Sequence, residues 1–268
     1  MPEATSVASG IRPPGGGRMR CLLFGATGRT GGRVLTDLLV RGVAVRALAR
    51  ARGGASAAAR LRPAAGGHPG LEVIEAEVAS LGAAELRAHL EGCDTVVCCL
   101  GPNVSLRGVF GPPYDLVAGT VERLIDAADA LRPEVPIRLV LMSSVSVNRP
   151  ERADARRGPL ERAFLWVLRG LLPPARDNQR AADALVRRVG PRHPTFAWVA
   201  VRPDALVAGE TGAYRTHEAL VTSIFRADRT RIADVAHFMA ELVTDLATWE
   251  RWRGQMPVVV SETAGASS

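Results

Sequence analysis

The feature that most constrains the fold is a run of glycines between a short apolar segment and an amphipathic one. Gly25-Ala-Thr-Gly28-Arg-Thr-Gly31 directly follows the apolar run Arg20 to Phe24 and directly precedes Gly31 to Val40, which has helical spacing of apolar residues. In such a strand–loop–helix unit the first glycine permits a tight turn, the second lets the backbone approach a pyrophosphate, and the third lets helix and strand pack closely. The helix amino terminus adds N–H groups and a positive dipole. The loop therefore predicts a dinucleotide site.

The rest of the chain alternates apolar runs with amphipathic stretches, which is typical of βαβ units. The expected strands are Arg20 to Phe24, Val43 to Leu48, Leu71 to Ala76, Thr95 to Leu100, Ile137 to Met142 and Phe196 to Val201. The expected helices are Gly31 to Val40, Ala83 to Leu90, Leu116 to Ala130, Arg180 to Val189 and Ile232 to Leu246. The pattern predicts an α/β class protein, a doubly wound Rossmann fold with a mostly parallel sheet of six strands and a small C-terminal substrate-binding region.

Two segments interrupt the alternation. Residues 150–175 hold a charged loop and the amphipathic stretch Leu160 to Leu172, and residues 204–230 follow the last expected strand. Ligands of open α/β sheets bind beyond the carboxyl ends of the strands, so we expect both segments to wall a substrate pocket. We expect Phe164 to Leu168, within that stretch, to be a core-packing helix face rather than a membrane-surface one, because Arg162 and Arg169 interrupt any apolar stripe. We predict a flexible leader, residues 1–18, followed by one domain, residues 19–268.

The amino-acid composition limits the classes of molecule that the chain is expected to bind. The net charge is +7, but all 34 basic residues are arginine, so the charge indicates a bias toward arginine rather than nucleic-acid binding. Aromatic residues, on which bases could stack, make up only 4% of the chain. No apolar run is long enough to span a bilayer. The four cysteines lack metal-binding spacing, as do the histidines, and three of the cysteines lie in apolar runs. We expect a cytoplasmic protein, a monomer or weak homodimer, that binds a small-molecule substrate, with no metal site, nucleic acid or membrane partner.

The end of the second expected strand bears on the cofactor. The acidic residue that usually holds a ribose 2′-hydroxyl is missing, because no Asp or Glu occurs between Val43 and Leu71. The strand runs instead into Arg50-Ala-Arg52, and a guanidinium there suits a 2′-phosphate. The sequence favours NADP over NAD, with solvated surface arginines as the alternative explanation.

These residues resemble the atypical short-chain dehydrogenase/reductases with an NAD(P)H-binding domain, and among them the NmrA-like and the biliverdin reductase B, or flavin reductase, types. The resemblance spans about residues 19 to 260. It is carried by the glycine loop, by Arg50, by Cys99-Leu-Gly101, by Met142-Ser-Ser144 and by Val201-Arg-Pro203. Where the flavin reductase type has a histidine after its sixth strand, this chain has Ala205, and the insert 150–174 looks closer to reductase-like tailoring proteins of aromatic polyketide pathways, which indicates secondary metabolism.

The resemblance implies a cofactor site residue by residue. It assigns the pyrophosphate to the glycine loop, the 2′-phosphate to Arg50, the adenine surroundings to Glu77 and Val78, and the ribose and nicotinamide side to Leu100, Gly101 and the ends of the fifth and sixth strands. The implied cofactor-binding residues are Gly25, Thr27, Gly28, Arg29, Thr30, Gly31, Arg50, Glu77, Val78, Leu100, Gly101, Ser143 and Pro203.

The catalytic apparatus of typical short-chain dehydrogenases is absent from the sequence. Those enzymes use a tyrosine with a lysine four positions later, but this chain has no lysine, and its tyrosines, Tyr114 and Tyr214, have no arginine at that spacing either. The polar candidates at strand ends are Ser144, Asn103 and Asp177, of which Ser144 is the predicted catalytic residue, orienting a carbonyl or the nicotinamide by a hydrogen bond.

The expected function is an NADP(H)-dependent oxidoreductase, a reductase acting on a conjugated or aromatic small molecule such as a quinone, a flavin or a polyketide-type ketone. Two alternatives stay open: an NmrA-like redox sensor that binds the dinucleotide without turnover, and a non-redox isomerase or dehydratase on the same scaffold.

Overall fold

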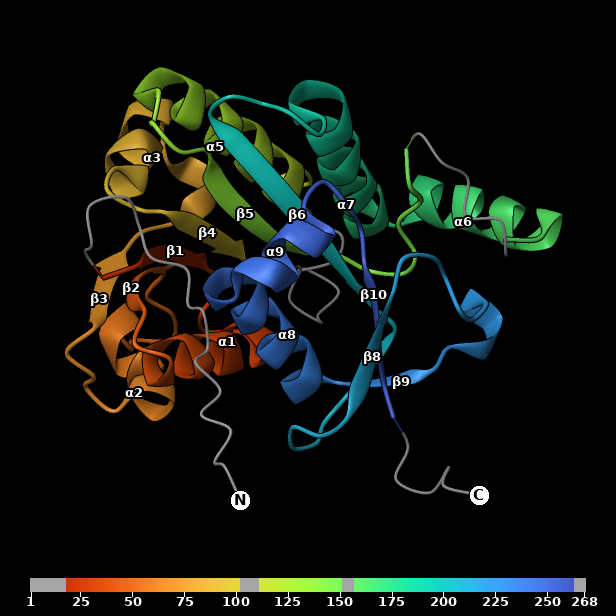
Figure 1. The fold of residues 1–268 in the computed structure, drawn as a ribbon, viewed down its shortest axis with the longest axis horizontal. Helices are drawn as coiled ribbons and strands as arrows, with labels where there is room; N and C mark the ends of the chain where they lie inside the picture. Colours follow the sequence, from red (N-terminus) through yellow and green to blue (C-terminus); the bar gives the residue numbers. More distant parts are fainter. Residues whose placement is uncertain (1–17, 102–110, 151–156, 263–268) are drawn as a thin grey trace, which may run out of the picture.

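The computed structural model describes residues 18–101, 111–150 and 157–262. The predicted leader lies outside the described residues except for Arg18. The central sheet has the strand order β3-β2-β1-β4-β5-β6-β10-β8 (Figure 1). Its strands are β1 (Arg20–Phe24), β2 (Ala44–Ala49), β3 (Leu71–Glu75), β4 (Thr95–Cys98), β5 (Ile137–Met142), β6 (Phe196–Pro203), β10 (Val258–Ser261) and β8 (Tyr214–His217). All neighbouring pairs are parallel except β10 and β8.

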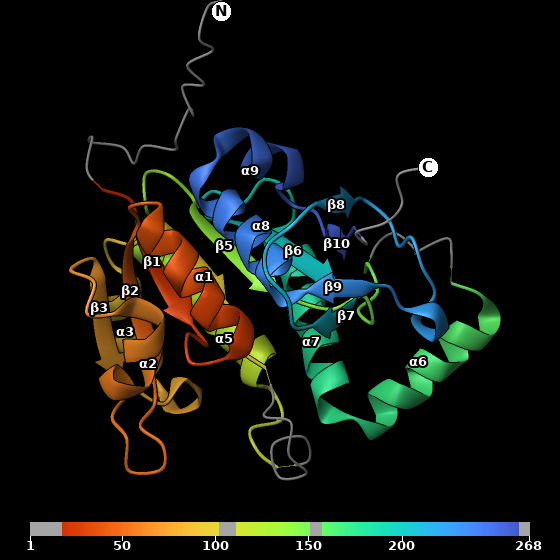
Figure 2. The same ribbon diagram turned by 90° about the horizontal axis from the view of Figure 1, so that it is seen from below.

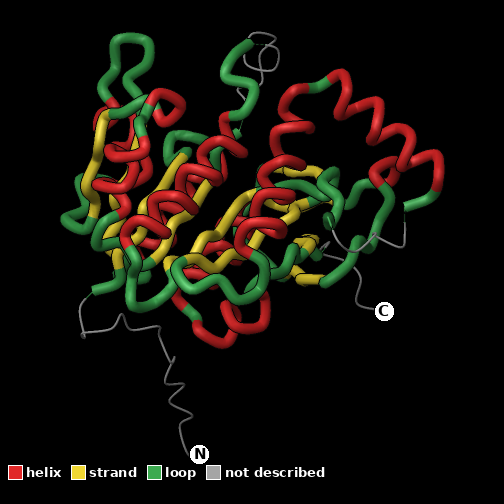
Figure 3. Tube along the Cα trace, turned by 90° about the horizontal axis from the view of Figure 1, so that it is seen from above, coloured by secondary structure: helices red, strands yellow, loops and turns green. Residues whose placement is uncertain are grey.

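Helices cover both faces of this sheet, as the alternating pattern predicted (Figures 1 and 3). One face carries α1 (Arg29–Val40), α2 (Ala57–Ala65), α8 (Ile232–Thr244) and α9 (Leu246–Trp252), and the other carries α3 (Ala83–Leu90), α5 (Leu116–Leu131) and α7 (Pro173–Ala184). Alternate residues of each strand enter the two cores, as in β4, where Val97 packs on the first and Val96 on the second. The doubly wound, mostly parallel Rossmann fold is therefore confirmed.

The sheet is wider than the six strands we expected. β10 extends it beyond β6 in parallel, with Val258 opposite Arg202, and β8 pairs with β10 in the antiparallel sense. A separate small sheet joins β7 (Ala205–Val207) to β9 (Arg229–Arg231). These strands have three or four residues each, too few for alternation or an apolar run to separate them from loop sequence.

Two helix boundaries differ from expectation for local reasons. The helix expected from Arg180 begins earlier, at Pro173, because Pro173 and Pro174 fit the first turn of α7, where the missing N–H costs no hydrogen bond. Helix α7 ends at Ala184 and is continued by the π-helical turn Leu185–Val189. The expected single helix Ile232 to Leu246 is interrupted at Asp245, whose carboxylate accepts a hydrogen bond from the Thr248 N–H at 2.6 Å and caps α9.

The prediction that Phe164 to Leu168, within the stretch Leu160 to Leu172, packs on the core is wrong, because Phe164, Trp166 and Val167 are exposed. The segment forms α6 (Pro159–Leu171), which extends away from the body of the molecule (Figure 2). Leu165 is buried, but Trp166 is 78% exposed. Arg169, expected to interrupt the apolar stripe, turns inward and donates to the Ser146 carbonyl at 2.9 Å. Burial accordingly lowers the pKa of Arg169.

Candidate functional site

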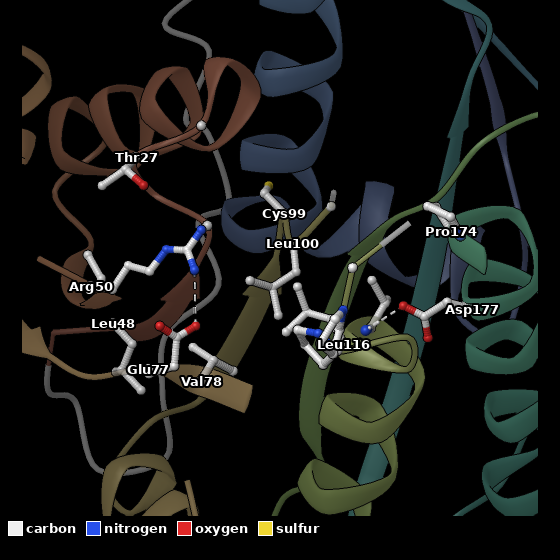
Figure 4. A pocket seen from close by; sticks show the side chains of 18 of the residues that line it. Thr27, Leu48, Arg50, Glu77, Val78, Cys99, Leu100, Leu116, Pro174 and Asp177 are labelled. Carbon is white, nitrogen blue, oxygen red and sulfur yellow. Dashed lines mark hydrogen bonds and ion pairs between the residues drawn. The ribbon is translucent and has the colours of Figure 1, made fainter. Parts of the chain in front are cut away.

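A cavity of about 460 Å³ opens at the carboxyl ends of β1, β2, β3 and β4, the edge at which parallel α/β sheets bind ligands. In Figure 4, Thr27 and Arg50 lie on one side of the cavity and Leu116 and Pro174 on the other, with Leu100 between them. Its lining residues are Gly25, Thr27, Gly28, Leu48, Ala49, Arg50, Arg52, Arg60, Ala76, Glu77, Val78, Cys99, Leu100, Gly101, Gly111, Pro112, Pro113, Tyr114, Leu116, Val117, Pro173, Pro174, Asp177 and Asn178.

The glycines of the loop are required by close backbone packing. Gly25 has φ +78°, and a Cβ there would lie 2.4 Å from the Cys99 carbonyl oxygen at the end of β4. A Cβ on Gly31 would lie 2.1 Å from the Gly25 carbonyl oxygen. A Cβ on Gly28 would meet only the Gly25 carbonyl oxygen, at 3.2 Å. Gly25 and Gly31 therefore hold the turn together, whereas Gly28 leaves backbone open toward the cavity.

The amino terminus of α1 completes this end of the cavity. Gly28 is the N-cap and has no side chain to satisfy the first N–H groups, and the first turn contains no acidic residue. Such N–H groups have no acceptor inside the helix, and the helix dipole favours an anion beside them. Thr27 and Gly28 line the cavity, whereas Arg29, Thr30 and Gly31 form the first turn behind them. The geometry fits a pyrophosphate.

The lining residues after the end of β2 and before β3 are basic, and one carboxylate lies among them. Arg50, Arg52 and Arg60 line the cavity together with Glu77. The Arg50 guanidinium lies 3.2 Å from the Glu77 carboxylate, with both side chains about half exposed (Figure 4). Arg60, on α2, donates to the Arg50 carbonyl oxygen at 2.9 Å. The sequence reasoning had Arg50 and Glu77 in the site but did not predict that they would pair, and it missed Arg60.

The remaining predicted residues divide between the cavity and the strand ends beside it. Val78, Leu100 and Gly101 line the cavity, and the cofactor contacts that the resemblance implies for them stay predictions. Ser143, Ser144 and Pro203 lie at the ends of β5 and β6 and are not part of its lining. Their assignment to the nicotinamide side stays a prediction.

The two serines differ in their bonding. The Ser143 N–H donates to the Val201 carbonyl at 2.8 Å, while its buried hydroxyl has no hydrogen-bond partner. The Ser144 hydroxyl oxygen accepts hydrogen bonds from the Ser146 N–H, at 3.2 Å, and from the Ser146 hydroxyl, at 3.1 Å. Ser144 is thus engaged in its own turn, a common arrangement for a serine that ends a strand.

Asp177, a sequence candidate for acid–base chemistry, acts as a helix cap. Its two carboxylate oxygens accept the N–H groups of Val117, at 2.8 Å, and Ala118, at 2.9 Å, in the first turn of α5. Burial raises the pKa of Asp177, and the two backbone hydrogen bonds act in the opposite direction. The other candidate, Asn103, lies outside the described residues.

One wall of the cavity was predicted only in part. Tyr114 and Leu116, before and at the start of α5, face Pro173, Pro174 and Asn178 of α7. The proline pair was a readable signal, since proline is favoured in the first turn of a helix. Of the two expected pocket segments, 150–175 reaches the cavity through these prolines, while no described residue of 204–230 lines it.

Across 18–101, 111–150 and 157–262, no three His, Cys, Asp or Glu side chains gather as a metal site would require. No described helix is both long and apolar enough to cross a membrane.

The fold and the glycine loop define an NAD(P)-binding protein of the atypical short-chain dehydrogenase/reductase kind. The family described as NAD(P)H-binding matches residues 25–246, and the chain belongs to it. None of the curated proteins matches the sequence significantly.

Solved structures share the fold at low sequence identity. An oxidoreductase from Lactococcus lactis is 19% identical with a TM-score of 0.62, the match covering 91% of this chain and 92% of that one. A candidate NADH-flavin reductase from Streptococcus pneumoniae is 16% identical with a TM-score of 0.59, covering 91% and 100%. The yeast methylglyoxal/isovaleraldehyde reductase, solved with NADPH, is 14% identical with a TM-score of 0.61, covering 91% and 78%.

Proposed function

We propose that the protein is an NADP(H)-dependent oxidoreductase that reduces a conjugated or aromatic small molecule, such as a quinone, a flavin or a polyketide-type ketone. One observation carries the choice of cofactor: the cavity is lined both by the glycine loop and by Arg50, Arg52 and Arg60. Guanidinium groups recognise phosphate through charge-assisted hydrogen bonds, and a dinucleotide whose pyrophosphate lies on the loop places its 2′-phosphate at this end.

The chain's own residues would bind and orient the cofactor. The N–H groups at the start of α1 would hold the pyrophosphate, Arg50 the 2′-phosphate, and Leu48 and Val78 the adenine between apolar surfaces. Leu100 and Gly101 would lie on the ribose and nicotinamide side. The bound nicotinamide supplies the hydride, so the protein needs few reactive side chains of its own.

The substrate class follows from the scarcity of proton donors around the cavity. Asp177 is engaged as a cap, and Tyr114 is the phenol among the described lining residues, with Ala118 rather than a base four positions on. The second phenol, Tyr214, lies outside the lining and donates to Glu241. Burial, together with that hydrogen bond, raises its pKa well above the usual range. An acceptor that stabilises its own negative charge, as quinones, flavins and conjugated ketones do, is best suited to such a site.

The relatives are consistent with this proposal, because one is a candidate flavin reductase and another is a reductase solved with NADPH. The same scarcity of donors also supports the alternative of a dinucleotide-binding redox sensor, and turnover separates the two. We further propose that residues 19–268 form one domain. We also propose a cytoplasmic location, since none of the four cysteines, all in the described residues, forms a disulfide. The polyketide-type substrates place the proposed reaction in secondary metabolism.

A screen of NADPH oxidation tests the function. Purified protein is assayed with flavins, quinones and polycyclic aromatic ketones, and with cyclohexanone as an unactivated ketone of similar polarity. We expect turnover with at least one conjugated acceptor and little with cyclohexanone, because general acid catalysis, worth about 10²–10⁴-fold, is missing. Tight NADPH binding without turnover would favour the sensor, and turnover of a substrate without any dinucleotide would favour the isomerase or dehydratase. Fast reduction of cyclohexanone would overturn the assigned substrate class.

A further inference from the structure

The solvent side of α6 is unusually apolar for the surface of a soluble chain. Leu160, Phe164, Val167 and Leu171 follow one another at spacings of four, three and four residues, which places them in one stripe along the helix. Trp166 lies to one side of the stripe. Arg169 turns inward to the Ser146 carbonyl, so no charged side chain interrupts it.

The apolar stripe is held outward by a buried polar contact on the opposite side of the helix. Glu161 and Arg157 form an ion pair at 3.3 Å, and both side chains are nearly fully buried. The Glu161 carboxylate also accepts the Ile224 N–H at 3.0 Å and the Ser223 hydroxyl at 3.1 Å, while Arg157 donates to the Val145 carbonyl. Rotating α6 to bury the stripe would break this network and leave a buried charge unpaired, which is strongly unfavourable.

A second element enlarges the patch. The segment fixed by Glu161 continues into the short 3-10 helix Ile224–Arg226, where the Phe225 ring lies 5.3 Å, centroid to centroid, from Phe164. We call the resulting surface the α6 patch. Its members and their exposed fractions are Leu160 81%, Phe164 44%, Trp166 78%, Val167 46%, Leu171 68% and Phe225 60%.

The size of the α6 patch corresponds to one side of a protein–protein interface. With about 200 Å² for each fully exposed side chain, these fractions leave on the order of 700 Å² of apolar surface in water. The largest patch on a typical monomer is about 300–600 Å², and each partner of a standard stable interface buries about 800 Å².

We propose that the α6 patch binds the α6 patch of a second copy of this chain, forming a two-fold symmetric dimer. The inference goes beyond the proposed function, since it concerns no residue assigned to the cofactor. A two-fold interface pairs one surface with itself, and the members of the α6 patch are all uncharged, with the exposed Arg162 and Arg226 beside it rather than within it. Ala163 and Gly170, seven residues apart, lie between Trp166 and the stripe, so a second helix can approach closely there. The exposed Trp166 is the expected energetic centre, because tryptophan is enriched at such centres.

A second copy fits this surface better than a lipid bilayer does. Helices that lie on membranes carry several basic side chains along their polar face, which attract anionic headgroups. On α6 the inward turn of Arg169 leaves Arg162 as the exposed basic side chain. The rest of the side opposite the α6 patch is the buried contact of Glu161 and Leu165 with the body of the protein.

The test compares two substitutions of exposed valines to glutamate in the full chain. Val167→Glu places a charge in the α6 patch, and Val40→Glu, the matched control, places one at an 82% exposed position at the end of α1. Sedimentation velocity is measured from about 1 to 100 µM protein, the range in which interfaces of modest affinity dissociate. We expect dimers of the unchanged protein and of Val40→Glu, and a dimer dissociation constant raised about thirtyfold or more in Val167→Glu. Trp166→Ser serves as a second patch variant if Val167→Glu proves unstable by circular dichroism.

Several outcomes would overturn the proposal. A protein that stays monomeric throughout this range, or a dimer that both patch variants leave intact, removes the assignment. Flotation with vesicles of phosphatidylcholine and phosphatidylserine tests the membrane alternative: a monomer that floats, and no longer floats as Val167→Glu, assigns the α6 patch to lipid. None of these measurements uses NADPH or activity, so failure here is distinguishable from failure of the proposed function.

Discussion

The ion pair between Arg50 and Glu77 gives the sharpest test of cofactor choice. A 2′-phosphate would either share the Arg50 guanidinium with the Glu77 carboxylate, now 3.2 Å from Nη1, or exchange with that carboxylate. The side chains are 44% and 49% exposed, so the pair contributes only about 0–1 kcal/mol. A charge-assisted hydrogen bond to phosphate contributes about 1.5–3 kcal/mol, so the exchange favours the phosphate.

Two substitutions separate the partners. Arg50→Ala should raise the dissociation constant for NADPH by about tenfold to a hundredfold and change that for NADH little, since it removes one such bond. Glu77→Gln should tighten NADPH binding by up to about fivefold, because it removes the competing charge and its repulsion of the phosphate. The NADH constant should again change little.

The assay is titration calorimetry with both dinucleotides at low and high salt. The preference of the unchanged protein for NADPH should shrink as salt rises, since exposed charges are screened. Arg62→Ala is the matched control, because Arg62 lies on α2 with Arg60 but outside the cavity lining. An unchanged NADPH-to-NADH ratio in Arg50→Ala, or weaker NADPH binding in Glu77→Gln, would refute the reasoning.

Five further substitutions, at four positions, test the site. Gly28→Val should abolish dinucleotide binding and leave the melting temperature nearly unchanged, whereas Gly31→Ala should destabilise the fold, because its Cβ would lie 2.1 Å from a backbone oxygen. Thermal melts and NADPH titrations of both variants measure these effects. A Gly31→Ala variant as stable as the unchanged protein would contradict the prediction. Ser144→Ala should slow turnover less than about tenfold, as its hydroxyl serves a local turn, and total loss of turnover with NADPH still bound would reveal a proton-transfer role. Asp177→Ala should lower stability by about 1–2 kcal/mol in urea unfolding through loss of the α5 cap. Asp177→Asn should leave the shape of the pH–rate profile unchanged, and a lost limb of that profile would make Asp177 an acid–base residue.

Elements whose determinants are contiguous in the sequence were predicted best. The glycine loop encodes its own turn, since Gly25, Gly28 and Gly31 all act within one strand–loop–helix unit, and the six longer strands follow from their apolar runs. Features assembled from distant segments were missed. The cap of α5 comes from Asp177, about 60 positions away, and no local pattern marks a carboxylate that binds another helix.

The outward face of α6 was missed for a similar reason. An amphipathic helix has two sides, and periodicity alone does not say which one faces the core. In α6 the side with Glu161 and Arg169 is turned inward because those groups find partners there, namely the Ile224 N–H and the Ser146 carbonyl. Buried polar groups are tolerated when hydrogen-bonded, so these contacts reverse the usual orientation.

Strand pairing also bears on the choice of cofactor. β2 and β3 are parallel, with Ala49 opposite Glu75, so the residues that follow the two strands leave the sheet at the same edge. Arg50 and Glu77 therefore meet although 27 positions separate them. A search for an acidic residue confined to the end of β2 finds none and predicts NADP, yet the adjacent strand brings a carboxylate to the same place. The preference for NADP thus depends on whether a 2′-phosphate competes successfully for Arg50, and the presence of the arginine alone does not decide it.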